Sequence, residues 1–339
     1  MLPVAMDTII FVFLIALMVT GLSTPWVRRA AISLGFVDAP AQRKMHSTPM
    51  PLLGGIAIVL GAALAVLLVF GEAQVVRAPQ VRGILLGSAL MAVVGLLDDR
   101  LNLPAWSKFL AQAVAVAVLI YFDVHVKLPL PLWLNYAVTF LWIVGIINAI
   151  NFLDNMDGLS AGISAVIAAF IMLLGALNEQ YLVGGLAAAI LGACLGFLRF
   201  NFKPAKIFMG DAGALFLGFL LAVLGIQLRF PQNSNFVTWM VPVFLFGVPI
   251  FDTTLVVFSR LRRGVSPNTA GKDHTSHRLV RLGLSQREAV MSLYLFAGIA
   301  GMIAIFITQA TILEGYFIGG VVALLAAYAI WWLDTRVKL

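Results

Sequence analysis

Residues 134–158 read LNYAVTFLWIVGIINAINFLDNMDG, a long apolar run that ends in a cluster of amide and carboxyl side chains. The run 134–152 is long enough to cross the hydrocarbon core of a bilayer, which is ~30 Å thick, as one helix. Several polar side chains at the end of such a helix are unfavourable unless they have partners or a function. This stretch therefore predicts a membrane-spanning helix with a functional site at one end.

Apolar runs of similar length recur along the whole chain of 339 residues, which is 62% hydrophobic and 11% charged. Soluble domains carry roughly 25% charged residues, so lipid must replace water around most of this chain. We expect one all-α integral membrane domain over residues 1–339, a bundle of about eleven transmembrane helices. The expected spans are 7–23, 53–70, 82–97, 109–122, 134–152, 159–177, 182–199, 212–229, 237–259, 288–310 and 315–333. Between the fourth and fifth spans, residues 124–131 alternate between apolar and polar and are compatible with a small hairpin.

The Lys and Arg residues predict the orientation of these helices. All but four of the 22 lie in connections after odd-numbered spans or in the C-terminal tail. The four on the opposite side are Arg77, Arg82, Lys127 and Arg229. Because basic residues concentrate in cytoplasmic loops, we expect the N-terminus outside and the C-terminus in the cytosol. The net charge of +7 then belongs to cytosolic loops, and nucleic acid is not an expected partner.

Four groups of polar side chains fall on this expected cytosolic face. They are Asp98 with Asp99 after the third span, residues 148–158 after the fifth, Asp211 before the eighth, and His274, His277 and Arg278 after the ninth. Adjacent carboxylates repel each other unless a pKa rises or a cation lies between them. Mg²⁺ prefers a few carboxylate or amide oxygens completed by water and phosphates, and imidazole with guanidinium suits a diphosphate. The combination favours metal-assisted phosphoryl transfer at the membrane.

Each group also has a simpler structural interpretation. Asp98 and Asp99 fit a solvated turn, residues 148–158 a capped helix end, and Asp211 a helix N-cap. The histidine segment fits a contact with anionic lipid headgroups. A secondary transporter for an anionic solute would also combine apolar spans with polar residues, although its site is expected near the bilayer midplane.

From about Arg43 to Gly283, these motifs resemble those of the polyprenyl-phosphate N-acetylhexosamine-1-phosphate transferases, of the glycosyltransferase 4 type. The segments that carry the resemblance are Arg43-Lys-Met-His46, Pro49–Gly55, Gly95–Asp99, Asn148–Gly158, Phe208–Asp211 and His274–Leu279. It implies transfer of N-acetylglucosamine-1-phosphate from UDP-GlcNAc to polyprenyl (undecaprenyl) phosphate with release of UMP, at the start of a cell-envelope glycan. It also implies a bacterial inner-membrane enzyme with its active site facing the cytosol and Mg²⁺ as cofactor, with Mn²⁺ as an alternative. Whether the enzyme is a homodimer stays open.

The resemblance further implies roles for individual residues. Asp98 or Asp99 would bind or deprotonate the lipid phosphate, and Asp211 would ligate Mg²⁺ with Asn151 or Asp154 nearby. The implied catalytic residues are Asp98, Asp99, Asp154 and Asp211. Asp157 would approach uracil and Phe208 would stack on it, and the other implied substrate contacts are Lys44, His46, Asn151, His274, His277 and Arg278.

Departures from the related phospho-MurNAc-pentapeptide translocase, which stays the alternative within the family, favour the UDP-GlcNAc branch. Asn155 and Ala214 stand where the translocase carries Gly and Ser. The translocase has consecutive histidines and one span fewer, whereas Thr275-Ser276 separate the histidines here. Asp252 in the ninth span also resembles the GlcNAc branch, although it fits equally a polar residue paired inside the bundle.

Overall fold

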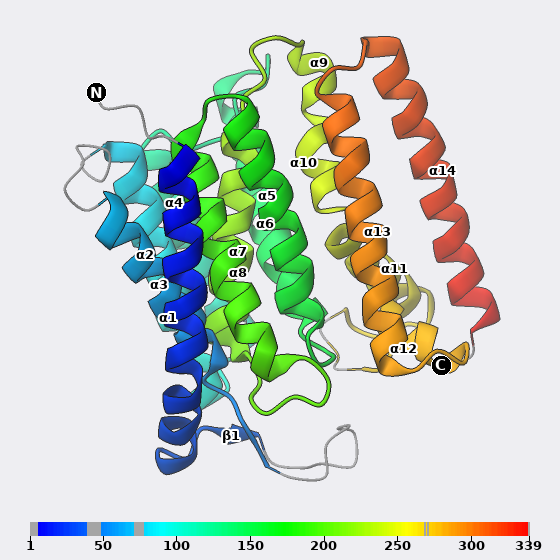
Figure 1. The fold of residues 1–339 in the computed structure, drawn as a ribbon. Coiled ribbons are helices and arrows are strands. Elements are labelled where there is room, and N and C mark those ends of the chain that lie inside the picture. Colours follow the sequence, from blue (N-terminus) through cyan, green and yellow to red (C-terminus); the bar gives the residue numbers. More distant parts are fainter. Residues whose placement is uncertain (1–5, 39–48, 71–77, 268, 270, 338–339) are drawn as a thin grey trace. The chain divides into compact units, whose positions relative to one another are not determined.

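The computed structural model describes residues 6–38, 49–70, 78–267, 269 and 271–337, and these are mostly helical (Figure 1). Eight of the described helices are long and apolar enough to cross a membrane, and a bent pair of shorter helices passes the same test together. The chain is therefore a multi-pass, all-α membrane protein. It divides into two compact units, Met1–Leu228 and Arg229–Leu339, and each is described by itself. The single domain, the count of eleven spans and the orientation of the termini stay predictions.

The first unit contains, in its described residues, eight helices and one short antiparallel sheet. The helices are α1 (Met6–Ser33), α2 (Gly54–Phe70), α3 (Pro79–Leu101), α4 (Ala105–Tyr121), α5 (Leu132–Leu153), α6 (Leu159–Leu177), α7 (Tyr181–Asn201) and α8 (Gly210–Gln227). The strands β1 (Val37–Asp38) and β2 (Met50–Pro51) pair with Val37 opposite Pro51. Helices α2 and α4, at the predicted second and fourth spans, are apolar but shorter than the others.

Helix α8 lies at the centre of the first unit. Every residue from Ala212 to Ile226 is buried, and α8 contacts α2, α3, α5, α6 and α7. A helix that is apolar on all sides is stable only where other helices surround it. The position of its N-terminal turn is therefore determined by several neighbours at once.

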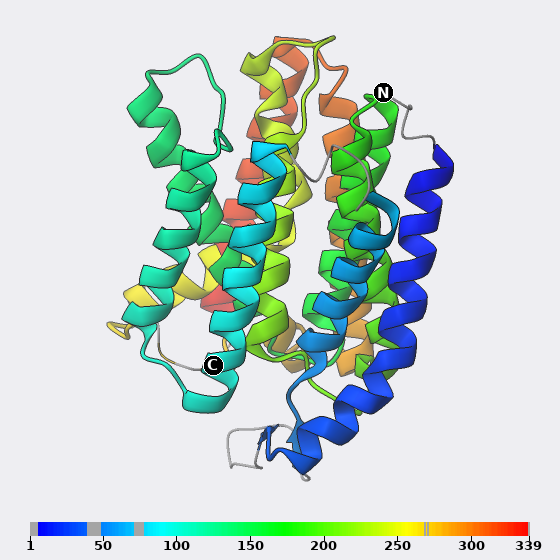
Figure 2. The same ribbon diagram turned by 90° about the vertical axis from the view of Figure 1, so that its left-hand side faces the viewer.

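Helices α1 and α7 approach closely through glycines. A Cβ atom at Gly192 would lie 2.3 Å from the carbonyl oxygen of Phe13, and one at Gly196 would lie 2.6 Å from that of Leu17. Small residues permit this approach, and van der Waals packing drives helix association inside a bilayer. Figure 2 shows α1 running beside α2 in the same unit, in agreement with their contacts.

Two expectations for the first unit were wrong in detail. Helix α1 continues to Ser33, well beyond the apolar run that ends near residue 23, and so includes Arg28 and Arg29. The Nε atom of Arg28 donates to the carbonyl oxygen of Lys206 at 2.9 Å, which gives this polar end a partner. The proposed hairpin at 124–131 is absent from this described segment, since side chains of α5 accept its N–H groups instead. Val126 donates to Thr139 Oγ1, and Leu128 donates to Asn135 Oδ1.

The second unit contains six helices in its described residues. They are α9 (Asn235–Thr238), α10 (Met240–Leu245), α11 (Gly247–Arg262), α12 (Thr275–Arg281), α13 (Gln286–Ile307) and α14 (Ile312–Arg336). The predicted ninth span is broken, since α9 and α10 are bent from α11 by 72°. Pro249 lies in the first turn of α11, where its missing N–H is tolerated but a continuous helix would lose a hydrogen bond. Capping boxes begin α13 at Ser285 and α14 at Thr311.

We predict that Gly192→Ala lowers the free energy of unfolding by about 1–3 kcal/mol, because its Cβ meets a backbone atom that cannot yield easily. Thermal unfolding of the detergent-solubilised protein measures this change. The matched control is Gly145→Ala on α5, where a Cβ would meet nothing within 4 Å. Equal stability of the two variants would contradict the tight α1–α7 contact.

Candidate active site

The carboxylate of Asp99, at the end of α3, binds the N-terminus of α8. Its Oδ1 atom accepts from the backbone N–H of Asp211 at 2.8 Å, and its Oδ2 atom accepts from that of Ala212 at 3.1 Å. The first N–H groups of a helix have no partners within it, and the helix dipole favours a negative charge there. Gly210 has φ +73°, and a Cβ at this position would lie 2.7 Å from Asp99 Oδ2. Asp99 and Gly210 together fix the turn that presents Asp211.

The Asp211 side chain is held by two further elements. Its Oδ1 atom accepts from Asn151 Nδ2 on α5 at 2.8 Å, and its Oδ2 atom lies 3.1 Å from Lys108 Nζ on α4. The same ammonium lies 2.6 Å from Asp98 Oδ2, so it bridges two carboxylates. The structure thus brings together the predicted residues Asp98, Asp99, Asn151 and Asp211 at the ends of three helices. The simpler interpretation of Asp211 as an N-cap does not hold, since Met209 has the N-cap position and the Asp99 side chain accepts from the first N–H groups.

Lys108 is a member of this cluster that sequence reasoning placed only among the loop cations. The side chain is about one quarter exposed and lies in the first turn of α4, between Trp106 and Phe109. A single cation at the start of an apolar helix is unfavourable without an anionic partner. The position of Lys108 in the sequence could therefore have predicted such a partner.

Asp154 and Asp157 follow the end of α5 and complete the acidic region. Partial burial, together with the negative charges of Asp211, Asp99 and Asp157, raises the pKa of Asp154 to about 8. Within the described part of the chain, no side chain donates a hydrogen bond to Asp154. The Asp157 carboxylate instead accepts from the N–H of Ala205 at 3.0 Å and lies 3.4 Å from Lys203 Nζ. The region therefore carries more negative charge than its own cations balance.

Asn201, at the end of α7, is a second residue that sequence reasoning missed. Its buried side chain accepts from the N–H of Gly158 at 3.0 Å and donates to the carbonyl oxygen of Ile207 at 3.0 Å. It therefore ties the Asp154–Asp157 segment to the segment that leads to half-buried Phe208. The backbone of Phe208 is held in turn by Pro51, whose carbonyl oxygen accepts its N–H at 2.8 Å. The signal that could have identified Asn201 is an asparagine at the end of an apolar span.

The oxygen atoms of the first unit fit Mg²⁺ better than a metal that prefers nitrogen or sulfur. Among the described residues, no group of three His, Cys, Asp or Glu lies close enough to hold a metal ion by itself. Mg²⁺ does not need such a group, because water and substrate phosphates complete its ligands. The partly exposed Asp211, the carbonyl oxygen of Asn151 and the unpartnered carboxyl of Asp154 are suitable donors. The uncompensated negative charge of this region is a further property of a cation site.

In the second unit, His274 and His277 begin the short helix α12, with ring centroids 6.0 Å apart. Buried Asp252 on α11 fixes this beginning. Its Oδ2 atom lies 2.8 Å from His274 Nδ1, and its Oδ1 atom accepts from the N–H of Thr275 at 2.6 Å. Asp252 is thus paired inside the unit, as the simpler interpretation of its sequence position proposed.

The electrostatic surroundings of α12 are unusual for a histidine-containing segment. Burial, with the nearby charges of His274, Lys272 and Arg281, lowers the pKa of His277 to about 4, and Asp252 offsets this only in part. Burial would raise the pKa of Asp273, but hydrogen bonds and charge from Arg260 dominate and lower it to about 2. His277 is therefore a neutral imidazole at pH 7 in the protein alone.

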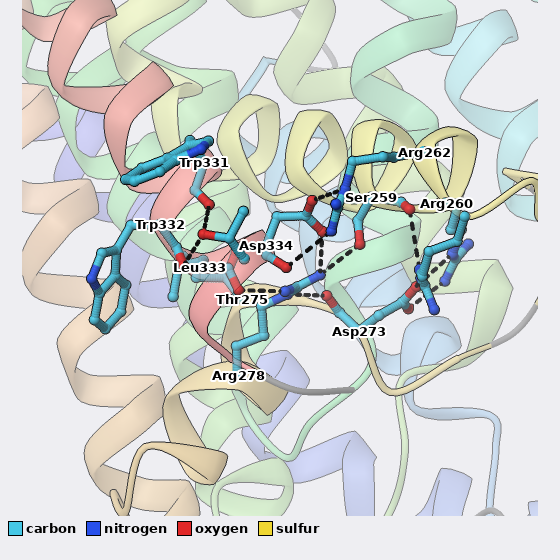
Figure 3. Close-up of polar contacts among 12 residues, drawn as sticks. Ser259, Arg260, Arg262, Asp273, Thr275, Arg278, Trp331, Trp332, Leu333 and Asp334 are labelled. Atoms are coloured by element: carbon cyan, nitrogen blue, oxygen red, sulfur yellow. Dashed lines mark hydrogen bonds and ion pairs between the residues drawn. The ribbon is translucent and has the colours of Figure 1, made fainter.

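The remaining predicted substrate contacts differ in their placement. Arg278 is completely buried, and its guanidinium binds groups of the second unit (Figure 3). Lys44 and His46 lie outside the described residues. The roles assigned to all these residues stay predictions.

Comparisons with known proteins agree with the motifs in this site. A family model described as glycosyl transferase family 4 matches residues 81–229, which include Asp98, Asn151 and Asp211. The chain is 37% identical to a probable undecaprenyl-phosphate N-acetylglucosaminyl 1-phosphate transferase of Bacillus subtilis, over 94% of this chain and 90% of the relative. It is 34% identical to a decaprenyl-phosphate N-acetylglucosaminephosphotransferase of Mycolicibacterium smegmatis, over 84% and 79%. It is 29% identical to an undecaprenyl-phosphate alpha-N-acetylglucosaminyl 1-phosphate transferase of Yersinia pestis, over 82% and 78%.

We predict that Asn201→Ala destabilises the first unit by about 2 kcal/mol, because it leaves two buried backbone groups without partners. Hydrogen exchange read by mass spectrometry should accelerate around Gly158 and Ile207. Asn178→Ala is the matched control, since Asn178 donates only to Leu174 of its own helix. Unchanged exchange at both segments in the Asn201 variant would contradict the linking role.

We also predict a pH dependence from His277, whose pKa falls from 6.5 in the unfolded chain to about 4 in the folded protein. The unfolded state binds more protons between these values, so this contribution is complete above pH 6.5 and is lost as the pH falls to 4. Its size is at most ~3 kcal/mol. The contribution of Asp273 to the pH dependence of stability falls below pH 3.8, its ordinary pKa, and so lies outside this window.

Unfolding temperatures at pH 7 and pH 4.5 test this prediction, with His277→Asn as the comparison. The drop on acidification should be smaller in the variant. An ¹⁵N NMR signal of His277 that titrates near pH 6.5 would disprove it.

Proposed function

Because the chain belongs to glycosyl transferase family 4, we propose that it transfers N-acetylglucosamine-1-phosphate from UDP-GlcNAc to a polyprenyl phosphate such as undecaprenyl phosphate. The reaction releases UMP and forms polyprenyl-diphosphate-GlcNAc, a first membrane step of cell-envelope glycan synthesis. The observation that carries the proposal is the cluster of Asp98, Lys108, Asn151 and Asp211 at the ends of four helices. The sugar in the names of the relatives supports UDP-GlcNAc over UDP-MurNAc-pentapeptide.

We assign Mg²⁺, with Mn²⁺ as an alternative, to Asp211 with Asn151 and Asp154 as further ligands. The bound ion would neutralise charge on the diphosphate of the sugar nucleotide. Support comes from the oxygen donors and from the raised pKa of Asp154, which reflects burial first and then the nearby negative charges of Asp211, Asp99 and Asp157. Asn151 fits this assignment because its amide nitrogen orients Asp211 and leaves its own carbonyl oxygen for a second contact.

Lys108 supplies the protein's own positive charge at the reaction centre. Its ammonium already lies between two carboxylates, where it compensates part of their repulsion. A phosphate group brought to this cluster would find in Lys108 a partly buried cation, whose charge has a stronger effect than it would have in bulk water.

For Asp99 we propose a positioning role rather than removal of a proton from the lipid phosphate. Both of its oxygens accept from backbone N–H groups of α8. Asp98 is similarly engaged by Leu103 and Lys108. A phosphomonoester has its second pKa at ~6 and is largely dianionic near neutral pH, so it attacks without a protein base.

The nucleoside of UDP-GlcNAc would lie against Asp157 and Phe208. Asn201 holds the segments of these two residues together through its hydrogen bonds to Gly158 and Ile207. His274 and His277 are proposed to bind the diphosphate. A neutral His277 donates one hydrogen bond without adding charge, and an approaching anion would favour its protonated form.

We place the enzyme in a bacterial inner membrane with its N-terminus outside and its active site facing the cytosol. The asymmetry of Lys and Arg supports this orientation. The cluster lies where α3 and α5 end and α8 begins, which favours a surface enzyme over a transporter with a site at the midplane.

The test supplies purified protein with polyprenyl phosphate, Mg²⁺ and either UDP-GlcNAc or UDP-MurNAc-pentapeptide, and measures UMP. We expect UMP only with UDP-GlcNAc, and we expect Asp211→Asn to reduce the rate by at least about 10³-fold, because it removes a charge at the centre of the site. Omission of the divalent ion should have a similar effect.

Asp123→Asn is the control for Asp211→Asn. Asp123 is an exposed carboxylate of the first unit that pairs with Lys127, and its loss should leave the rate unchanged. Near-normal turnover of Asp211→Asn would refute the metal assignment. Solute flux across sealed vesicles without UMP release would instead favour the transporter.

A further inference from the structure

Arg278 is the largest fully buried side chain among the described residues, with no exposed surface. Each of its three guanidinium nitrogens has an acceptor inside the second unit (Figure 3). Nε donates to the carbonyl oxygen of Asp273 at 2.9 Å, Nη1 to that of Leu333 at 2.7 Å, and Nη2 to Ser259 Oγ at 2.9 Å. A buried guanidinium requires such partners, because desolvation of an unpaired charge is very unfavourable.

These acceptors come from three separate segments. Ser259 belongs to α11, Asp273 precedes α12, and Leu333 lies near the C-terminal end of α14. Asp334 of α14 adds the charge partner, with its Oδ1 atom 3.7 Å from Arg278 Nη2, and it also forms an ion pair with Arg262. Among the described residues of α14, only Gly315, Leu333 and Asp334 are buried, so the buried part of this helix is concentrated where it meets Arg278.

The segment that Arg278 holds is the one that carries the two histidines. The bond to the Asp273 carbonyl oxygen fixes the residue directly before His274. The Asp273 side chain is itself bound by Arg260 with two hydrogen bonds, at 2.7 and 2.9 Å, and by Arg263 at 2.8 Å. Without the α14 contacts, α12 would keep its attachments to α11 and α13 but lose the hydrogen bond and ion pair that join it to α14.

We infer that Arg278 is a positioning residue, and that the C-terminal end of α14, through Leu333 and Asp334, is the support that fixes the His274–His277 turn. The inference rests on the proposed function in one respect, that these histidines bind the diphosphate of UDP-GlcNAc. Under this inference α14 has a role in substrate binding, and Arg278 does not itself contact the diphosphate.

The experiment compares Arg278→Lys, Arg278→Gln, Asp334→Asn and the milder Ser259→Ala in UMP release with UDP-GlcNAc, polyprenyl phosphate and Mg²⁺. We expect Asp334→Asn to raise the KM for UDP-GlcNAc about tenfold, with kcat and the KM for polyprenyl phosphate within about twofold of the unaltered protein. Arg278→Lys should be as impaired as Arg278→Gln, because an ammonium cannot reach three diverging acceptors. Partial unfolding would lower kcat alone, so the change in KM separates positioning from loss of folded protein.

The double variant Arg278→Gln with Asp334→Asn should be no worse than Arg278→Gln alone, since both changes remove one shared support. Thr311→Ala is the matched control, because it removes the N-cap at the opposite end of α14 and should leave KM unchanged. Hydrogen exchange of residues 273–282, which needs no turnover, should accelerate in Asp334→Asn and Ser259→Ala but not in Thr311→Ala.

Normal KM and unchanged exchange in Asp334→Asn and Ser259→Ala would overturn the inference. Retained activity of Arg278→Lys beside an inactive Arg278→Gln would also overturn it, since it would show that only the charge matters. If the unaltered protein released no UMP, the proposed function would fail, and the exchange measurement would still decide whether α14 fixes the turn.

Discussion

The contact between the Asp99 carboxylate and the first N–H groups of α8 is the interaction on which the first unit depends most. Helix α8 is buried on all sides from Ala212 onward, and the N–H groups of its first turn need acceptors from outside the helix. Asp99 satisfies two of them, and its charge suits the positive end of the helix dipole. The same contact sets the position of Asp211, which lies in this first turn. The stability of the central helix and the geometry of the candidate site thus share one cause.

The carboxylates of the molecule separate into two kinds according to their partners. Asp99, Asp252 and Asp273 have both oxygens bound by donors of the protein, and they hold backbone or cationic groups in place. Asp154 has no such donor within the described residues, and the oxygens of Asp211 are bound only by the side chains of Asn151 and Lys108. A carboxylate whose oxygens are all engaged must lose a structural bond before it binds a ligand. Asp154 is therefore the carboxylate that binds a metal with the least rearrangement, whereas Asp211 would first exchange a contact with Asn151 or Lys108 for one with the ion.

The sequence predicts the membrane helices well because a bilayer requires long apolar runs, and it predicts the shared location of Asp98, Asn151 and Asp211 because charge placement orients those runs. It does not predict Lys108 or Asn201 as members of the site. The partners of Lys108 depend on the packing of α4 against α3 and α5, and those of Asn201 depend on the packing of α7 against α6. Neither follows from the local sequence pattern. The C-terminal end of α1 and the break before α11 were missed for a different reason. Helix α1 continues through a polar end that an apolar run does not mark. The break before α11 falls within an otherwise apolar stretch, so hydrophobicity does not mark it either.

The histidine segment shows why membership in one motif does not imply one role. His277 and Arg278 are adjacent in sequence, but neighbouring side chains on a helix point about 100° apart. On α12 the guanidinium is bound by groups of α11 and α14, whereas His277 Nδ1 is buried without a partner among the described residues. A buried donor or acceptor without a partner lowers stability unless a ligand completes it. The imidazole is therefore the group in this motif that is suited to a ligand, and the arginine beside it is suited to hold the helix in place.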